Sequence, residues 1–134
     1  MGEQIIDTIR KIEKARTALR QAMDEERMAT TPKLKDLNLI PRVYEIFKDV
    51  KGDAFKTINA RKQFIFVVIY LYAPCRFFGG KMPKGLRNEI SRASGVSCAN
   101  TISNSCTELM VLYTAYSDFR QDVDEILNAV VETL

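Results

Sequence analysis

Apolar residues recur every three or four positions along most of this chain, which is the spacing of one face of an α-helix. In residues 3–28 they form a heptad-like seam that Arg16 interrupts, made of Ile5, Ile9, Ile12, Leu19 and Met23. Ile6 and Ala15 widen this seam. The pattern predicts one amphipathic helix, which either packs against the rest of the domain or pairs in a coiled-coil dimer. Arg16 at a seam position counts against the coiled coil.

Two prolines, Pro32 and Pro41, interrupt the helical pattern after this segment. Pro41 is expected to be the first residue of a second helix, which ends at Gly52. The apolar face of this helix consists of Val43, Ile46, Phe47 and Val50.

A third helix is predicted from an N-cap at Asn59 to Ala73, where Pro74 stops it. The stretch from Phe64 to Ala73 is apolar and rich in β-branched and aromatic residues, so a strand is the alternative. Its start, NARKQF, and its helical neighbours favour a helix.

The chain then passes through a loop with two turns, one at Gly79-Gly80 and one at Pro83–Gly85. A short helix over Leu86–Ala93 follows, and Gly95 supplies the next turn. Ser97 is expected to cap a further helix. The buried face of that helix consists of Ala99, Ile102, Cys106, Leu109 and Tyr113.

Ser117 or Asp118 is expected to cap a last helix or to bend the chain into it, and the buried face of this helix is made of Phe119, Val123, Ile126, Leu127, Val130 and Leu134. These patterns together predict an all-α fold of about six helices. Residues 1–28 are expected to brace the rest or to mediate self-association, and residues 29–134 to form a single domain.

Composition agrees with one globular domain, because 46% of the 134 residues are hydrophobic and 28% are charged. The net charge of +3 is unevenly divided along the chain. Residues 61–92 carry a net charge of +6, whereas residues 93–134 carry −5. A basic middle and an acidic end are expected when one face of a protein meets phosphates, although a basic segment is also compatible with an ordinary solvated surface.

Several function classes are disfavoured by what the sequence lacks. It contains no histidine, the commonest general base and metal ligand. Its three cysteines have no paired spacing, which suits free thiols in a reducing compartment. The longest apolar run, Phe64–Ala73, is half the length that a transmembrane helix needs. We therefore expect a cytoplasmic protein that is not an enzyme, binds no metal or cofactor and does not enter a membrane.

The stretch LRNEISRASGVSCANTISN, residues 86–104, joins a short helix to a second helix through the turn ASGVS. This arrangement resembles a helix-turn-helix DNA-binding unit. With the preceding segment RKQFIFVVIYLYAP, residues 60–116 resemble the DNA-binding domains of the bacterial replication initiator and tryptophan repressor class. Ser97-Cys98 stands where the replication initiators have an Asp-His pair. The resemblance implies a helix-turn-helix at residues 86–113 and double-stranded DNA as the partner.

On this hypothesis the second helix enters the major groove, and its uncharged polar face contacts base edges through Asn100, Thr101, Ser103 and Asn104. Contacts to phosphates are expected from Arg61, Lys62, Lys81, Lys84, Arg87 and Arg92. The backbone amides of Gly79-Gly80 are a further candidate phosphate contact. A homodimer is expected, because two half-sites add affinity.

The alternative is a helical interaction or assembly module that binds no nucleic acid. Many helical corners touch no DNA, and the expected recognition helix carries no Arg or Lys, although Arg to guanine is the commonest specific base contact. The polar face of that helix is then a protein contact. The sequence does not choose a DNA site or a role in activation, repression, replication or packaging.

Overall fold

The computed structural model describes residues 2–95 and 106–134. The predicted all-α fold is confirmed: these residues form six α-helices and three short 3₁₀ helices, with no strand among them. The chain divides into two units, residues 1–31 and residues 32–134.

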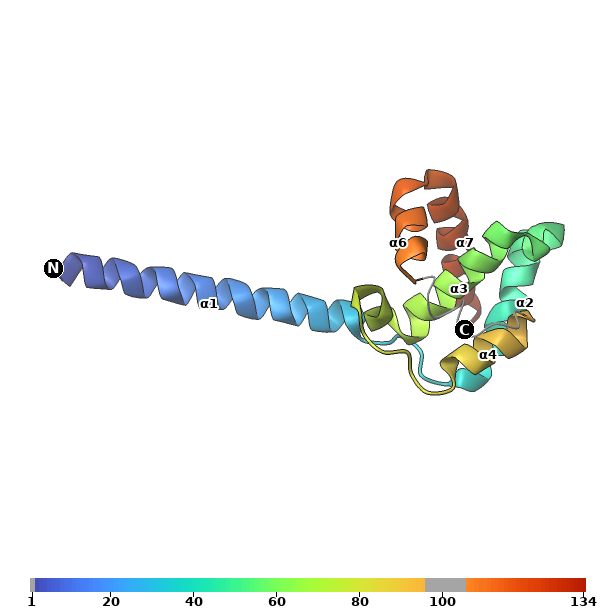
Figure 1. Cartoon of the computed structure of the whole chain (residues 1–134), viewed down its shortest axis with the longest axis horizontal. Coiled ribbons are helices and arrows are strands. Elements are labelled where there is room, and N and C mark those ends of the chain that lie inside the picture. Colours follow the sequence, from blue (N-terminus) through green and yellow to red (C-terminus); the bar gives the residue numbers. More distant parts are fainter. Residues whose placement is uncertain (1, 96–105) are drawn as a thin grey trace. The chain divides into compact units, whose positions relative to one another are not determined.

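The first unit is a single helix, α1 (Gly2–Thr30), which runs without interruption for 29 residues (Figure 1). It includes the whole range predicted from the heptad-like seam. None of its residues is buried.

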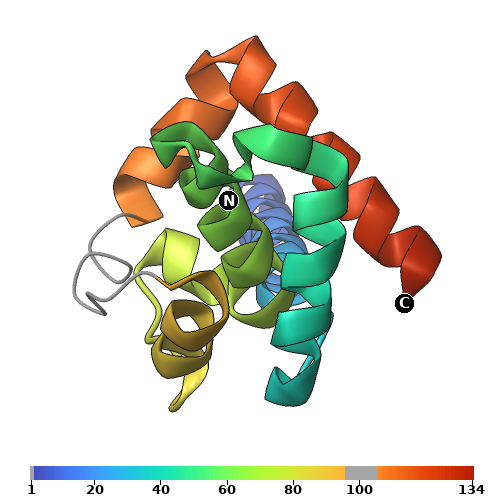
Figure 2. The ribbon, with the colours of Figure 1, turned by 90° about the vertical axis from the view of Figure 1, so that its right-hand side faces the viewer.

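The second unit is a bundle of helices around a central one (Figure 2). Its α-helices are α2 (Ile40–Lys51), α3 (Ile58–Tyr72), α4 (Leu86–Ser94), α6 (Cys106–Ala115) and α7 (Ser117–Thr133). Its 3₁₀ helices are η1 (Leu37–Leu39), η2 (Gly52–Lys56) and η3 (Pro74–Phe78). The central helix is α3, which packs against α2, α4, α6 and α7. Every residue from Gln63 to Ile69 is buried, so the apolar run is the core helix of the unit and not a strand.

Aromatic side chains from several helices fill the core around α3. Phe64 lies against Phe47 of α2, with ring centroids 5.3 Å apart. On another side, Phe66 stacks on Tyr113 of α6 at 4.8 Å and meets the edge of Phe119 of α7 at 6.4 Å. These contacts bury large apolar area and join α2, α6 and α7 to the same helix.

Three predicted helix starts are wrong by one or two residues. The helix α2 begins at Ile40, one residue before Pro41. The N-cap of α3 is Thr57 and not Asn59, because the Thr57 hydroxyl accepts a hydrogen bond from the backbone N–H of Ala60 at 3.2 Å. The N-cap of α7 is Tyr116, which has extended backbone and makes no side-chain cap. Ser117 and Asp118 therefore lie in the first turn of α7. The predicted end of α2 at Gly52 is confirmed, with Gly52 at φ 59°.

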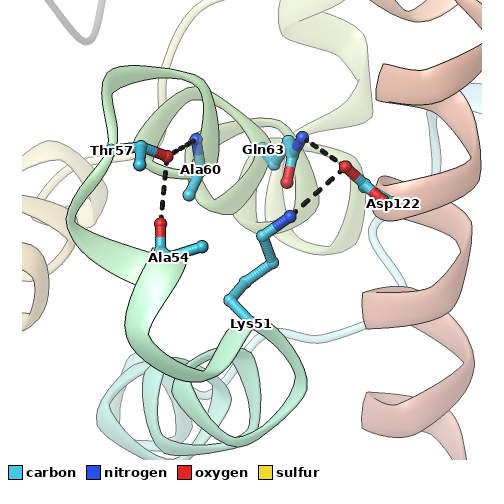
Figure 3. A network of polar contacts seen from close by, with 6 residues as sticks. All are labelled: Lys51, Ala54, Thr57, Ala60, Gln63 and Asp122. Carbon is cyan, nitrogen blue, oxygen red and sulfur yellow. Dashed lines mark hydrogen bonds and ion pairs between the residues drawn. The ribbon is translucent and has the colours of Figure 1, made fainter.

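One polar network is built into this apolar bundle (Figure 3). The carboxylate of Asp122 on α7 accepts a hydrogen bond from the Gln63 amide at 3.1 Å and pairs with the Lys51 ammonium at 3.3 Å. Gln63 is 3% exposed. Through one oxygen of the Asp122 carboxylate, the network links Lys51 at the end of α2 and Gln63 of α3 to the helix α7.

Candidate nucleic-acid interface

The segment between α3 and α4 carries several of the predicted phosphate contacts, and its backbone is held in a fixed shape. Pro74 follows Ala73 and begins η3, because proline cannot continue the α-helical hydrogen bonding. Gly79 then takes the left-handed conformation, at φ 86°. Gly85, at the same φ, precedes the first residue of α4, Leu86. The two predicted turns are confirmed at these positions.

Gly80 is required at its position by close packing. A β-carbon added there would lie 2.8 Å from the carbonyl oxygen of Cys75 and 2.9 Å from its sulfur. This close approach accompanies a hydrogen bond from the Gly80 amide to the Cys75 carbonyl at 2.8 Å. The Gly79 amide donates to the Arg76 carbonyl at 3.4 Å. Both amides of the turn already have intramolecular acceptors, so the expectation that they contact a phosphate loses its basis.

The turn instead forms one wall of a pocket with basic side chains. The pocket has a volume of about 390 Å³ and is lined by Arg76, Gly79, Gly80, Lys81, Met82 and Arg87. Three of these six residues are cationic, and none is acidic. We call Arg76, Lys81 and Arg87 the basic triad. Guanidinium and ammonium groups around one opening without a carboxylate favour an anionic ligand such as a phosphate.

The members of the basic triad differ in how they are held. Arg76 is half-buried in the middle of η3, and its guanidinium donates a hydrogen bond to the carbonyl of Gly80 at 3.4 Å. Lys81 and Arg87 are exposed. Within the described residues, neither Lys81 nor Arg87 forms an ion pair, so both charges are available to a ligand.

Lys84 is exposed and lies on the same connection, but it lines a different, largely apolar pocket together with Pro83 and Tyr72. Arg92 lies near the end of α4 and is paired with Glu89 at 2.7 Å. These two predicted contacts therefore belong to the neighbourhood of α4, but not to the pocket.

The structure separates Arg61 and Lys62 from this region. Both lie in the first turns of α3, whereas the pocket follows the other end of that helix. The eleven residue steps from Arg61 to Tyr72 correspond to about 16 Å along a helix axis. Lys62 is also occupied, because its ammonium lies 2.6 Å from the carboxylate of Glu108 on α6. The six predicted cations do not form one continuous site.

The predicted base-contacting residues Asn100, Thr101, Ser103 and Asn104 lie outside the described residues, as do Val96 and Ser97. The first half of the predicted unit is described. Its helix is confirmed as α4, and Gly95 ends it at φ 73°. Leu86 and Ile90 are buried and face the core. The helix-turn-helix itself remains a prediction.

One member of the basic triad, Arg76, was absent from the phosphate contacts predicted from sequence. The sequence did contain a signal for it, because Arg76 and Lys81 flank the Gly79-Gly80 turn in PCRFFGGK. The turn folds the chain back and brings positions 76 and 81 to the same pocket.

Charge of the opposite sign gathers on α7. A groove of about 470 Å³ runs along this helix and includes Asp124, Glu125 and Glu132 in its lining. Among the residues that the structure describes, no three histidine, cysteine or acidic side chains are placed to hold a metal ion. None of the helices within the same ranges is both long enough and apolar enough to span a bilayer.

No protein-family model matches this chain, and comparisons with curated proteins and with solved structures found no significant similarity.

Proposed function

We propose that this protein binds double-stranded DNA, with the cations of the basic triad contacting backbone phosphates. The observation that carries the proposal is the pocket of Arg76, Lys81 and Arg87, which has three cations and no acid in its lining. Phosphate contacts of this kind supply affinity and orientation, but no sequence choice.

We assign the recognition of a DNA base sequence to the segment that follows α4. Arg87 lies in the first turn of α4, so a phosphate held by the triad fixes the position of this helix on the duplex. The uncharged side chains of Asn100, Thr101, Ser103 and Asn104 then contact base edges in the major groove. The resemblance of residues 86–113 to a helix-turn-helix supports this division of roles.

The remaining cations are expected to contribute unequally. Lys84 and Arg61 are exposed and have no ion pair within the described part of the chain, so they can reach phosphates directly. Lys62 and Arg92 must first leave the carboxylates of Glu108 and Glu89. A cation that exchanges a carboxylate for a phosphate gains less binding free energy than an unpaired cation does. Lys62 and Arg92 are therefore expected to contribute less to DNA binding.

Fluorescence anisotropy of a labelled random-sequence duplex tests the proposal. The charge reversal Lys81→Glu with Arg87→Glu removes two phosphate contacts. It should weaken binding at low salt about tenfold or more and reduce the salt slope by about 2.

The matched control is Lys14→Glu with Arg120→Glu, which changes the net charge equally at two exposed positions that do not line the pocket. This control should bind nearly as well as the parent chain. Equal losses in the two variants would mean that net charge acts alone, and the pocket would then have no specific role.

The second candidate function is an assembly module without nucleic-acid binding. It is favoured by α1, which exposes seven large apolar side chains: Ile5, Ile6, Ile9, Ile12, Leu19, Met23 and Met28. The dependence of binding on salt concentration distinguishes the two hypotheses. Phosphate binding falls steeply between about 50 and 200 mM salt, whereas an apolar protein interface barely responds.

A further inference from the structure

The unit of residues 1–31 consists of the helix α1 alone, so no other element of this unit covers its apolar face. Five side chains form its seam, and their exposed fractions are 56% for Ile5, 49% for Ile9, 48% for Ile12, 61% for Leu19 and 59% for Met23. No residue of this helix is buried. Helices in proteins are stabilised mainly by burial of an amphipathic face, so a seam of this kind is expected to have a partner.

The spacing of the seam is compatible with an antiparallel partner of the same sequence. Its positions, including Arg16, follow a 4-3-4-3-4 spacing that is centred on residue 14. Reversing the helix about this centre places Ile5 opposite Met23 and Ile9 opposite Leu19. We propose that α1 pairs in antiparallel orientation with α1 of a second copy of this chain. The proposal is independent of DNA binding.

The single charge in the seam favours this orientation. In a parallel in-register pair, Arg16 would face Arg16 of the second copy, and the two like charges would repel. In the antiparallel pair, Arg16 lies opposite Ile12 of the second copy. Glu13 follows Ile12 in the sequence and lies on the side of the seam that faces Arg16 of the other copy. Each Arg16 therefore meets Glu13 of the other copy. Two Glu and two Arg then form a neutral group at the centre of the seam.

The flanks of the seam support the same choice. Parallel coiled coils are commonly oriented by ion pairs between the two flanking positions of neighbouring heptads. On one flank of α1 these positions hold Thr8, Ala15 and Ala22, none of which is charged. No such pair can form in a parallel arrangement, whereas the small side chains allow close approach in an antiparallel one.

The seam extends along most of α1. The eighteen residue steps from Ile5 to Met23 correspond to about 27 Å of helix. Each copy contributes five apolar side chains over this length, and all of them are at least 48% exposed in the single chain.

Sedimentation velocity of the full chain at increasing concentration tests the pairing. Leu19→Glu places a charge in the seam and should weaken association about tenfold or more. Met28→Glu is the matched control, since Met28 is 74% exposed but lies outside the seam. A parent chain that is monomeric at all concentrations, or a control that weakens association as much as Leu19→Glu, would overturn the proposal.

A charge swap tests the contact between Arg16 and Glu13. Arg16→Glu should dissociate the pair, because four acids then meet at its centre. Adding Glu13→Arg to that variant should restore association. In a parallel pair Arg16→Glu only exchanges one like-charge contact for another, so an unchanged affinity of the single variant would refute the antiparallel arrangement.

Oxidative cross-linking reports the orientation directly, with the parent chain as the control for its own cysteines. Ile5→Cys mixed with Met23→Cys should give a disulfide between the two different chains when oxidised with copper phenanthroline. Each variant alone should give no product beyond that of the parent. Efficient cross-linking of Ile5→Cys with itself would show a parallel pair and overturn the proposal.

Discussion

Two tyrosines, Tyr113 and Tyr72, have a raised pKa, and the contacts of Tyr113 show why. Its hydroxyl donates a hydrogen bond to the Asp124 carboxylate at 2.7 Å. This bond, together with burial and the charge of Asp124, raises the pKa of Tyr113 from 10.0 to about 12. Burial and the charge of Asp36 likewise raise the pKa of Tyr72 to about 12. Both phenols therefore stay neutral in the folded protein at a pH where an exposed tyrosine ionises.

The sign of the resulting pH dependence follows from these values. A pKa that is higher in the folded state contributes stability below about pH 10, and this contribution is lost as pH rises toward about 12. Tyr113→Phe should therefore lower the free energy of unfolding at neutral pH, by about 1 kcal/mol for the lost hydrogen bond. The decline of stability between pH 10 and 12 should also become shallower.

Urea unfolding at a series of pH values measures both effects. Tyr116→Phe is the control, since Tyr116 is 59% exposed and should change stability little at neutral pH. An alkaline decline as steep in Tyr113→Phe as in the parent chain would exclude a contribution from Tyr113.

At the scale of the elements, apolar spacing predicted where the helices lie, but not which residue begins each one. Thr57 and Asn59 are both suitable N-caps, and the difference between them is tertiary. The preceding turn η2 fixes Thr57, because the Ala54 carbonyl accepts bonds from both the Thr57 amide and its hydroxyl, at 3.1 and 3.0 Å. Pro74–Phe78 was likewise predicted as part of a loop and forms the helix η3.

The position of this cap predicts unequal effects of two similar substitutions. Thr57→Ala removes the acceptor for the Ala60 amide and should lower the free energy of unfolding by about 1 kcal/mol. Asn59→Ala should have little effect, because Asn59 is exposed in the first turn and caps nothing in the described contacts. Urea unfolding compares the two. A larger loss for Asn59→Ala would contradict the assignment of the cap.

The network around Asp122 gives a second prediction at this scale. Asp122→Ala leaves the Lys51 ammonium, on a side chain that is 15% exposed, and the buried Gln63 amide without their common acceptor. The expected loss of stability is about 1 to 3 kcal/mol. Glu45→Ala breaks the more exposed pair with Lys48 and should cost less than about 0.5 kcal/mol. Equal losses in chemical denaturation would show that the network adds nothing beyond an ordinary surface pair.

At the scale of the whole molecule, sequence predicted the fold class better than the candidate site. Helical spacing and the uninterrupted apolar run of α3 were enough for an all-α core. The site depends on how the chain folds back between α3 and α4, which spacing does not show. That fold brings Arg76 to Lys81 and Arg87, whereas Arg61 and Lys62 lie at the other end of α3.

The division of charge along the sequence becomes a division between elements. The basic triad follows the end of α3, and acidic side chains line a groove on α7. A protein charged in this way is expected to approach a polyanion with the triad first and to hold α7 away from it.

The affinity of the parent chain for duplex DNA, measured across a series of salt concentrations, tests the central claim most directly. Three triad cations on phosphates predict that the logarithm of the affinity falls linearly with the logarithm of the salt concentration, with a slope of about −2.7 or steeper. No binding at low salt, or binding that does not change with salt, would contradict the claim that this protein holds DNA through its basic triad.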